Sequence, residues 1–322
     1  MDAPEILDAF NGRGAAVPAA PLGMSSPILR RISLIIHAPT VGGRKLPKVF
    51  HWNDPDRLVH GFIRDLAECS HGAARFDLVE RLEVDEFPVK ADGFRYEPED
   101  FAARWRQRSG FHQPDAVDYH ALIRQFGLLE KVRGGQIDEA WLLAFPYAGY
   151  YESIMGGPGA FWCNAPPLQG TESSGRRFVI MGFNYERGVG EMLESFGHRT
   201  ESILAQVYRD HGGPSNLWER FIRHERTHPG QAEVGNIHFA PNSVRDYDWG
   251  NRRPVSSACD DWEGFPRLTG ARRMVDCEEW GRGDIRAHHC WWYRHLPHVE
   301  GETAGVLNNW WGYILDPERV RP

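Results

Sequence analysis

The feature that most constrains the fold is an apolar run followed by a helix and then a second strand. Residues 32–36 (ISLII) are apolar and rich in β-branched side chains, which predicts a buried strand. Asp54 and Pro55 mark a helix start, since aspartate accepts from free amides there and proline fits the first turn. The helix is expected to stop at Gly72, before a second strand over residues 76–84. Two strands separated by one helix predict a parallel pair.

The rest of the chain extends this pattern and then departs from it. Further strands are predicted over residues 140–145 and 178–183, and further helices over residues 119–129 and 189–208. From Gly235 onward Gly, Pro, Asn, Asp and Trp dominate, and no long periodic segment occurs. The expected fold class is therefore α/β, with a partly parallel sheet flanked by helices and a loop-rich, aromatic-rich C-terminal region packed on it.

Composition suggests one large folded unit. Residues 1–28, rich in Ala, Pro and Gly, are predicted to form a flexible N-terminal arm. Residues 29–322 are predicted to form a single catalytic domain, and a change in composition near residue 230 could divide it into an α/β part and an aromatic-rich C-terminal part.

Charge and cysteine content restrict the partners. The net charge of −7 argues against nucleic-acid binding, and the absence of an apolar run of about 20 residues argues against a membrane partner. The five cysteines are odd in number, far apart and never in a C-x-x-C pair, which favours reduced thiols and a cytoplasmic location.

One face of the helix predicted over residues 189–208 is unusually acidic. At about 100° per residue, Glu191, Glu194, His198 and Glu201 fall within an arc of roughly 80°, opposite the apolar face. Like charges at these spacings repel by a few tenths of a kcal/mol per pair unless a cation relieves them. Gly197, inside the helix, indicates that another group approaches closely. We therefore expect this face to form a metal or catalytic site; a buried polar network and a plain solvated surface are the alternatives.

Glu194 and His198 lie one helical turn apart, the spacing at which one helix face supplies two metal ligands. Their register resembles the H-E-x-x-H helix of zinc peptidases, with Glu194 and His198 in the places of the two histidines. The resemblance implies a peptide or amide substrate. However, Ser195 occupies the place of that family's general-base glutamate. Glu191 or Glu201 is then the nearest candidate base.

A third ligand has to come from another segment. His238, expected at a strand end beside a proline-fixed turn, is the preferred source, with Asp246 and Asp248 as alternatives. A mixed carboxylate–imidazole set points to a divalent ion; zinc is the first choice, and manganese or iron also suits.

Two other segments carry candidate groups. A tyrosine-rich turn follows the strand predicted over residues 140–145, and its Glu152 is an acid–base candidate. Arg187, at the end of the next strand, could bind a substrate carboxylate. Residues 288–298 hold four histidines, and we interpret them as a strand lining a cleft, where His295 or His298 could bind substrate or transfer protons.

Three functions remain open. The first is a metal-dependent hydrolase with its ion on the 189–208 helix. The second is a metal-free glycan-active enzyme with paired carboxylates and tryptophans that stack on sugars. The third is a non-catalytic ligand-binding protein with a structural ion. The expected substrate is accordingly a small molecule, a peptide or a glycan.

Overall fold

The computed structural model describes residues 27–321, and the arm expected over residues 1–28 lies almost entirely outside this range. Its centre is a five-stranded sheet of order β4-β1-β5-β7-β6, in which the first four strands are parallel and β6 is an antiparallel edge strand. The strands are β1 (Ile28–His37), β4 (Ala74–Val84), β5 (Glu139–Ala144), β6 (Ser153–Gly156) and β7 (Phe178–Asn184). The α/β expectation is confirmed.

The strand–helix–strand unit forms as predicted. β1 and β4 pair in parallel, and α2 (Pro55–Cys69) connects them. The side chain of Asp54 accepts a hydrogen bond of 3.1 Å from the amide of Arg57, so it caps the helix as its position in the sequence indicates.

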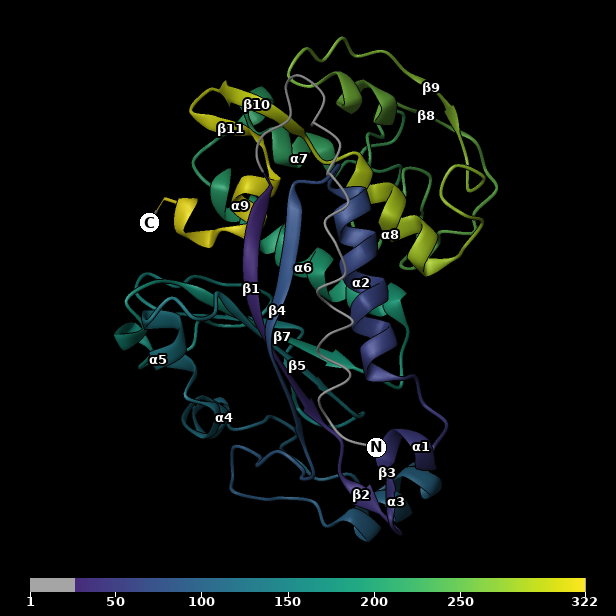
Figure 1. Ribbon diagram of the computed structural model, residues 1–322. Coiled ribbons are helices and arrows are strands. Elements are labelled where there is room, and N and C mark those ends of the chain that lie inside the picture. Colours follow the sequence, from purple (N-terminus) through teal and green to yellow (C-terminus); the bar gives the residue numbers. More distant parts are fainter. Residues whose placement is uncertain (1–26, 322) are drawn as a thin grey trace, which may run out of the picture.

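Helices cover both faces of the sheet (Figure 1). One face carries α2 and α6 (Val189–Val207), with α8 (Ile285–Arg294) packed against both helices. The other face carries α4 (Tyr119–Phe126) and α5 (Leu128–Arg133). Alternate residues of β1 divide between the two cores: Leu34 points to the α2–α6 side and Ile35 to the α4–α5 side.

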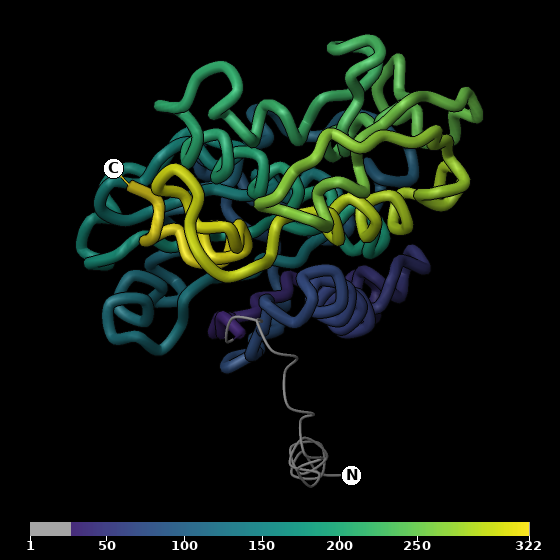
Figure 2. The backbone as a smooth tube through the Cα atoms, turned by 90° about the horizontal axis from the view of Figure 1, so that it is seen from above, coloured from purple at the N-terminus to yellow at the C-terminus, as the bar shows by residue number. Residues whose placement is uncertain are grey.

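Shorter elements complete the described part of the chain. In Figure 2 the C-terminal segments, drawn in yellow-green and yellow, lie next to one another. The short helices are α1 (Leu46–Val49), α3 (Pro98–Gln107), α7 (Leu217–Phe221), α9 (Trp311–Leu315) and the 3₁₀ turns η2 (Glu172–Ser174), η3 (Gly213–Ser215), η4 (Cys259–Gly264) and η5 (Pro317–Arg319). The two-stranded sheets pair β2 (Thr40–Val41) with β3 (Arg44–Lys45), β8 (Val255–Ser257) with β9 (Arg273–Val275), and β10 (His298–Thr303) with β11 (Val306–Asn309).

Three local predictions need correction. The helix expected over residues 119–129 is two helices, because Gly127 adopts a left-handed conformation (φ 60°) between them. Most of the histidine-rich segment forms helix α8 and not a strand, and the side chain of Asp284 caps it by accepting from the amide of Ala287. His238 does not end a strand; it lies in a loop.

The tryptophans from residue 218 onward are core residues. All eight of them, Trp218, Trp249, Trp262, Trp280, Trp291, Trp292, Trp310 and Trp311, are buried. They therefore stabilise the loop-rich region by burial, and they do not line an open cleft.

A fully buried ion pair joins α6 to the sheet. The guanidinium of Arg199 donates two hydrogen bonds of 2.7 Å to the carboxylate of Glu139, the first residue of β5. Neither side chain has any exposed surface. Arg199 also donates to the carbonyl of Ile314 in α9, so three elements meet at this pair.

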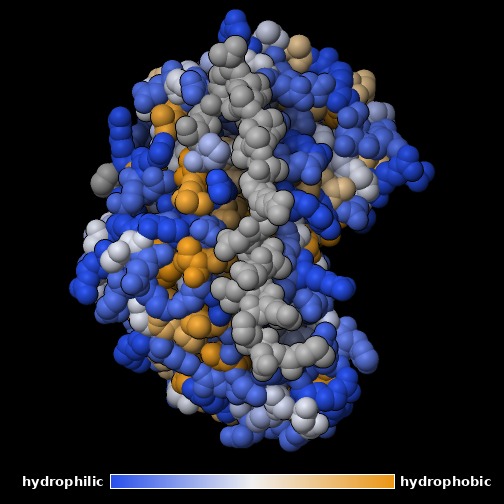
Figure 3. All heavy atoms as spheres, in the orientation of Figure 1, coloured by the Kyte–Doolittle hydropathy of each residue, from blue (hydrophilic) through white to orange (hydrophobic). Residues whose placement is uncertain are grey.

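The surface seen in Figure 3 is mostly hydrophilic, and its hydrophobic side chains form small separate groups. None of the helices within residues 27–321 is both long and apolar enough to cross a membrane. The five cysteines form no disulfide.

Candidate metal centre

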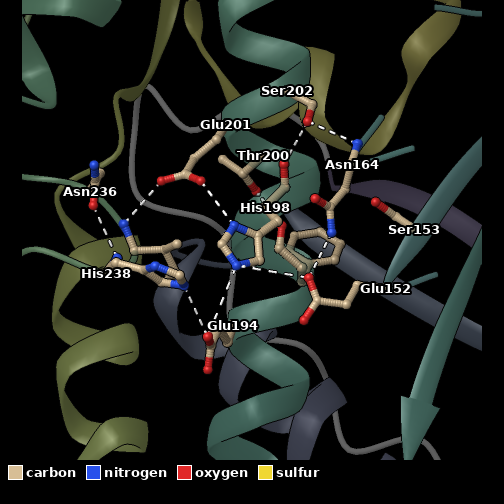
Figure 4. A network of polar contacts seen from close by, with 12 residues as sticks. Glu152, Ser153, Asn164, Glu194, His198, Thr200, Glu201, Ser202, Asn236 and His238 are labelled. Atoms are coloured by element: carbon tan, nitrogen blue, oxygen red, sulfur yellow. Dashed lines mark hydrogen bonds and ion pairs between the residues drawn. The ribbon is translucent and has the colours of Figure 1, made fainter. Parts of the chain in front are cut away.

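Three side chains from two segments converge beside α6. The ligand-type atoms of Glu194, His198 and His238 all lie within 4.8 Å of one another. Nε2 of His238 is 3.0 Å from Oε1 of Glu194, and Nε2 of His198 is 4.0 Å from the same oxygen. Figure 4 shows both imidazoles turned toward this carboxylate. The structure thus brings together the three residues that the sequence suggested as ligands.

Gly197 allows the loop that carries His238 to approach α6. A Cβ atom at this position would lie 2.5 Å from Cδ1 of Ile237, so only glycine leaves room for that side chain. The amide of Ile237 donates to Glu201 (3.1 Å), and the amide of His238 donates to the side chain of Asn236 (3.0 Å). The close approach expected at Gly197 is therefore made by the neighbour of His238.

A carboxylate orients each imidazole from behind. Nδ1 of His198 lies 3.1 Å from Oε2 of Glu201, and Nδ1 of His238 lies 3.3 Å from Oδ1 of Asp246. A carboxylate on Nδ1 directs Nε2 forward and raises its basicity, as is common for histidines that bind metals. Both rings thus present Nε2 to the same small volume.

The cluster is partly buried and strongly coupled. Burial alone would raise the pKa of Glu194, but hydrogen bonds from His238 and Tyr247 outweigh it and lower that pKa. Burial would likewise lower the pKa values of His198 and His238, but hydrogen bonds to Glu201 and Glu194, respectively, raise them above the ordinary histidine value. The site therefore favours an ionised carboxylate and protonated imidazoles, and a bound metal ion would have to displace the protons from both rings.

Glu152 and Tyr247 flank the three ligand atoms. Oε2 of Glu152 lies 3.8 Å from Nε2 of His198 and accepts a hydrogen bond of 2.6 Å from Asn164. The hydroxyl of Tyr247 donates to Oε1 of Glu194 at 3.0 Å. Glu152 thus stands on the Nε2 side of His198, whereas Glu201 stands on the Nδ1 side.

A cavity of about 240 Å³ opens beside Glu152, at the carboxyl ends of β5 and β7. Arg187, Glu191 and Tyr147 also line it. Oε2 of Glu191 accepts from the amide of Gly188 (3.0 Å), so this glutamate closes the first turn of α6. Arg187 is exposed, and among the described residues no carboxylate lies within ion-pair distance of its guanidinium.

Several groups differ from their expected places. Asp246 stands behind His238 and not among the ligand atoms, and Asp248 accepts from the amide of Val244 at 3.2 Å. Ser195 donates to the carbonyl of Glu191 within α6. Two neighbours of the site, Tyr247 and Asn164, were not selected from the sequence. Their positions depend on loops that have no periodic signal, although Tyr247 lies directly beside Asp246.

No protein-family model, curated protein or solved structure matches this chain. The described residues define an α/β protein with a carboxylate–imidazole cluster beside a cavity at the carboxyl ends of β5 and β7.

Proposed function

We propose that the protein is a metal-dependent hydrolase whose ion is held by Glu194, His198 and His238. One observation carries the proposal: two imidazoles, one hydrogen-bonded at Nδ1 to Glu201 and the other with Nδ1 3.3 Å from Asp246, direct Nε2 to the same carboxylate oxygen. A simple salt-bridge network would not need both rings to be fixed from behind.

Zinc is the ion that best fits the ligand set. Two imidazole nitrogens and one carboxylate oxygen are a common set of three protein ligands in catalytic zinc sites. A bound divalent ion would supply Lewis-acid chemistry and make a coordinated water acidic near neutral pH.

The surrounding residues suit the remaining steps of hydrolysis. Glu152 stands on the Nε2 side and is held by Asn164, so it is placed to take a proton from the attacking water. The hydroxyl of Tyr247 donates to Glu194, so it would hold this ligand carboxylate in place beside the ion. Glu201 positions His198, and the base role expected for Glu191 or Glu201 therefore passes to Glu152 in this proposal.

The rim of the site favours an extended substrate with a carboxylate and apolar groups, such as a peptide. Two exposed aromatic side chains adjoin it: Tyr147 lines the cavity, and the hydroxyl of Tyr247 binds Glu194. Aromatic rings offer large contact area at little entropic cost, and Arg187 at the cavity could bind a carboxylate. Hydrolysis of a peptide or amide bond follows from this rim and from the resemblance of α6 to the zinc-peptidase helix.

The test combines metal content, turnover and folding. Glu194→Gln and His198→Ala are each expected to lose one equivalent of ion and all hydrolysis of a panel of amide substrates. Their melting temperatures in metal-free buffer should stay close to that of the metal-free wild type. Gln206→Ala on the same helix is the control, and it should keep both ion and turnover.

A different result would overturn the proposal. If the wild type hydrolyses its substrate fully after chelation, the metal is not catalytic, and the metal-free glycan-active alternative takes precedence. If the two variants unfold more easily and the ion content is unchanged, the cluster is a structural charge network.

A further inference from the structure

A second group of metal-type side chains lies away from the first one. Among residues 27–321, two groups of three histidine, cysteine or acidic side chains place their ligand atoms within 4.8 Å of one another, and the second comprises Cys259, Asp260 and His295. Cys259 has no exposed surface and His295 is buried, whereas Asp260 is half exposed. The three residues come from η4 and the end of α8.

The backbone around this group fixes the orientation of its side chains. Nδ1 of His295 lies 2.8 Å from the carbonyl of Trp291, one turn earlier, so Nε2 is the ring nitrogen left for Cys259 and Asp260. A backbone carbonyl on one ring nitrogen is a frequent partner of a metal-binding histidine. The amide of Cys259 donates to the hydroxyl of Ser257 (3.1 Å), which positions the cysteine.

Asp260 is held from the outside by an arginine. Its Oδ1 accepts from Sγ of Cys259 at 3.3 Å and from Nη2 of Arg273 at 2.9 Å. A ligating carboxylate is normally hydrogen-bonded by further groups, and each carboxylate oxygen has two lone pairs. Arg273 also donates from Nε to Oδ2 (2.5 Å), so it holds both oxygens of Asp260, and the lone pair of Oδ1 that faces Sγ of Cys259 is the one left for a cation.

We propose that Cys259, Asp260 and His295 form a second metal site, selective for zinc, that ties the η4 loop to the end of α8. A thiolate together with an imidazole favours zinc over magnesium or calcium, which prefer oxygen ligands. The exposed side of Asp260 leaves the fourth position to water. The site would connect the loop-rich region to a helix that packs on α6, and it does not depend on the function proposed for Glu194, His198 and His238.

Cobalt(II) distinguishes the two sites, because only the second one contains sulfur. Metal-free wild-type protein titrated with cobalt(II) should develop a thiolate-to-cobalt charge-transfer absorption, and in the Glu194→Gln/His198→Ala double variant this absorption should saturate at one equivalent. The band should persist in the Glu194→Gln/His198→Ala double variant and disappear in Cys259→Ser. Cys277→Ser, which removes another buried cysteine of the same region, should keep it.

His295→Gln provides a second test that keeps the thiol in place. It should weaken cobalt binding at this site by at least about tenfold, even if Cys259→Ser fails to fold. Zinc should raise the melting temperature of the Glu194→Gln/His198→Ala double variant but not that of His295→Gln in the same background. The absence of a charge-transfer band in the wild type, or an unchanged affinity in His295→Gln, would refute the second site and leave the hydrolase proposal untouched.

Discussion

Replacing Gly197 by alanine should weaken metal binding without contacting any ligand. The new Cβ would lie 2.5 Å from Cδ1 of Ile237 and closer still to its Cγ1. Non-bonded carbon atoms in van der Waals contact are about 3.5 Å apart, so the side chain of Ile237 has to move by about 1 Å. His238 is the next residue along the chain. Functional sites tolerate displacements of only about 0.5 Å, so Nε2 of His238 should leave its place beside Glu194.

The expected cost to folding is small. Alanine is better than glycine inside a helix by about 1 kcal/mol, and overpacking costs about 1–3 kcal/mol. The net destabilisation of Gly197→Ala is therefore at most about 2 kcal/mol, which corresponds to a decrease of a few degrees in melting temperature. Zinc affinity should fall by at least about tenfold, the lower end for changes in the shell around a metal site.

Gly190 offers a matched control on the same helix. A Cβ there would lie 2.5 Å from Cγ2 of Ile285 in α8, so Gly190→Ala creates a clash of similar size away from His238. Both variants are titrated with zinc against a chromophoric chelator in the Cys259→Ser background, which isolates the first site. The Gly197→Ala/Ile237→Ala double variant should regain most of the affinity.

If Gly197→Ala binds zinc as tightly as Gly190→Ala, then the contact with Ile237 does not determine where His238 lies.

Three further predictions concern other parts of the molecule. Glu152→Gln should keep its zinc but lose turnover by at least about 100-fold, as removal of a general base requires; unchanged kcat would exclude Glu152 from that role. Arg199→Leu leaves the buried carboxylate of Glu139 without its main partner and should lower the free energy of unfolding by about 3 kcal/mol or more in urea titrations, whereas replacing both residues by leucine should restore part of the loss. Burial lowers the pKa of His37 from 6.5 to about 4, so the unfolded chain binds the proton more readily than the folded protein between these values. The free energy of unfolding should therefore fall by up to about 3 kcal/mol as the pH decreases from about 6.5 to about 4. Urea titrations of His37→Gln over the same pH range should show a smaller decrease. An equal decrease would contradict the assignment of this pH dependence to His37.

The sequence predicts correctly those helices and strands whose apolar residues follow a regular pattern and whose ends are marked by capping or turn residues. β1, α2 and β4 follow from an apolar run, an aspartate–proline start and a glycine stop, because each signal acts within a few residues. α8 was misread, because its aromatic side chains suggested a strand, while the cap at Asp284 and the packing of α8 against α2 and α6 favour a helix. β6 was missed, since it is four residues long and ends in glycine.

The candidate site could be predicted only where its residues share a helix. Glu194 and His198 follow from helical spacing. His238 lies 40 positions beyond His198 in a loop, so only the folded structure shows that it faces Glu194. The different roles of Glu152 and Glu201 depend on which nitrogen of His198 each one faces, and spacing along the chain contains no such information.

The buried pair of Arg199 and Glu139 fixes the angular position of α6 about its own axis. Arg199 directly follows His198, so their side chains leave the helix about 100° apart. With the guanidinium bound to the first residue of β5, rotation of the helix would break an ion pair that water cannot replace. The direction in which positions 194 and 198 face is thus determined from an adjacent face of the helix, independently of any ion. Evolution or engineering could exchange those two side chains for another ligand set, and the new pair would still face Glu152.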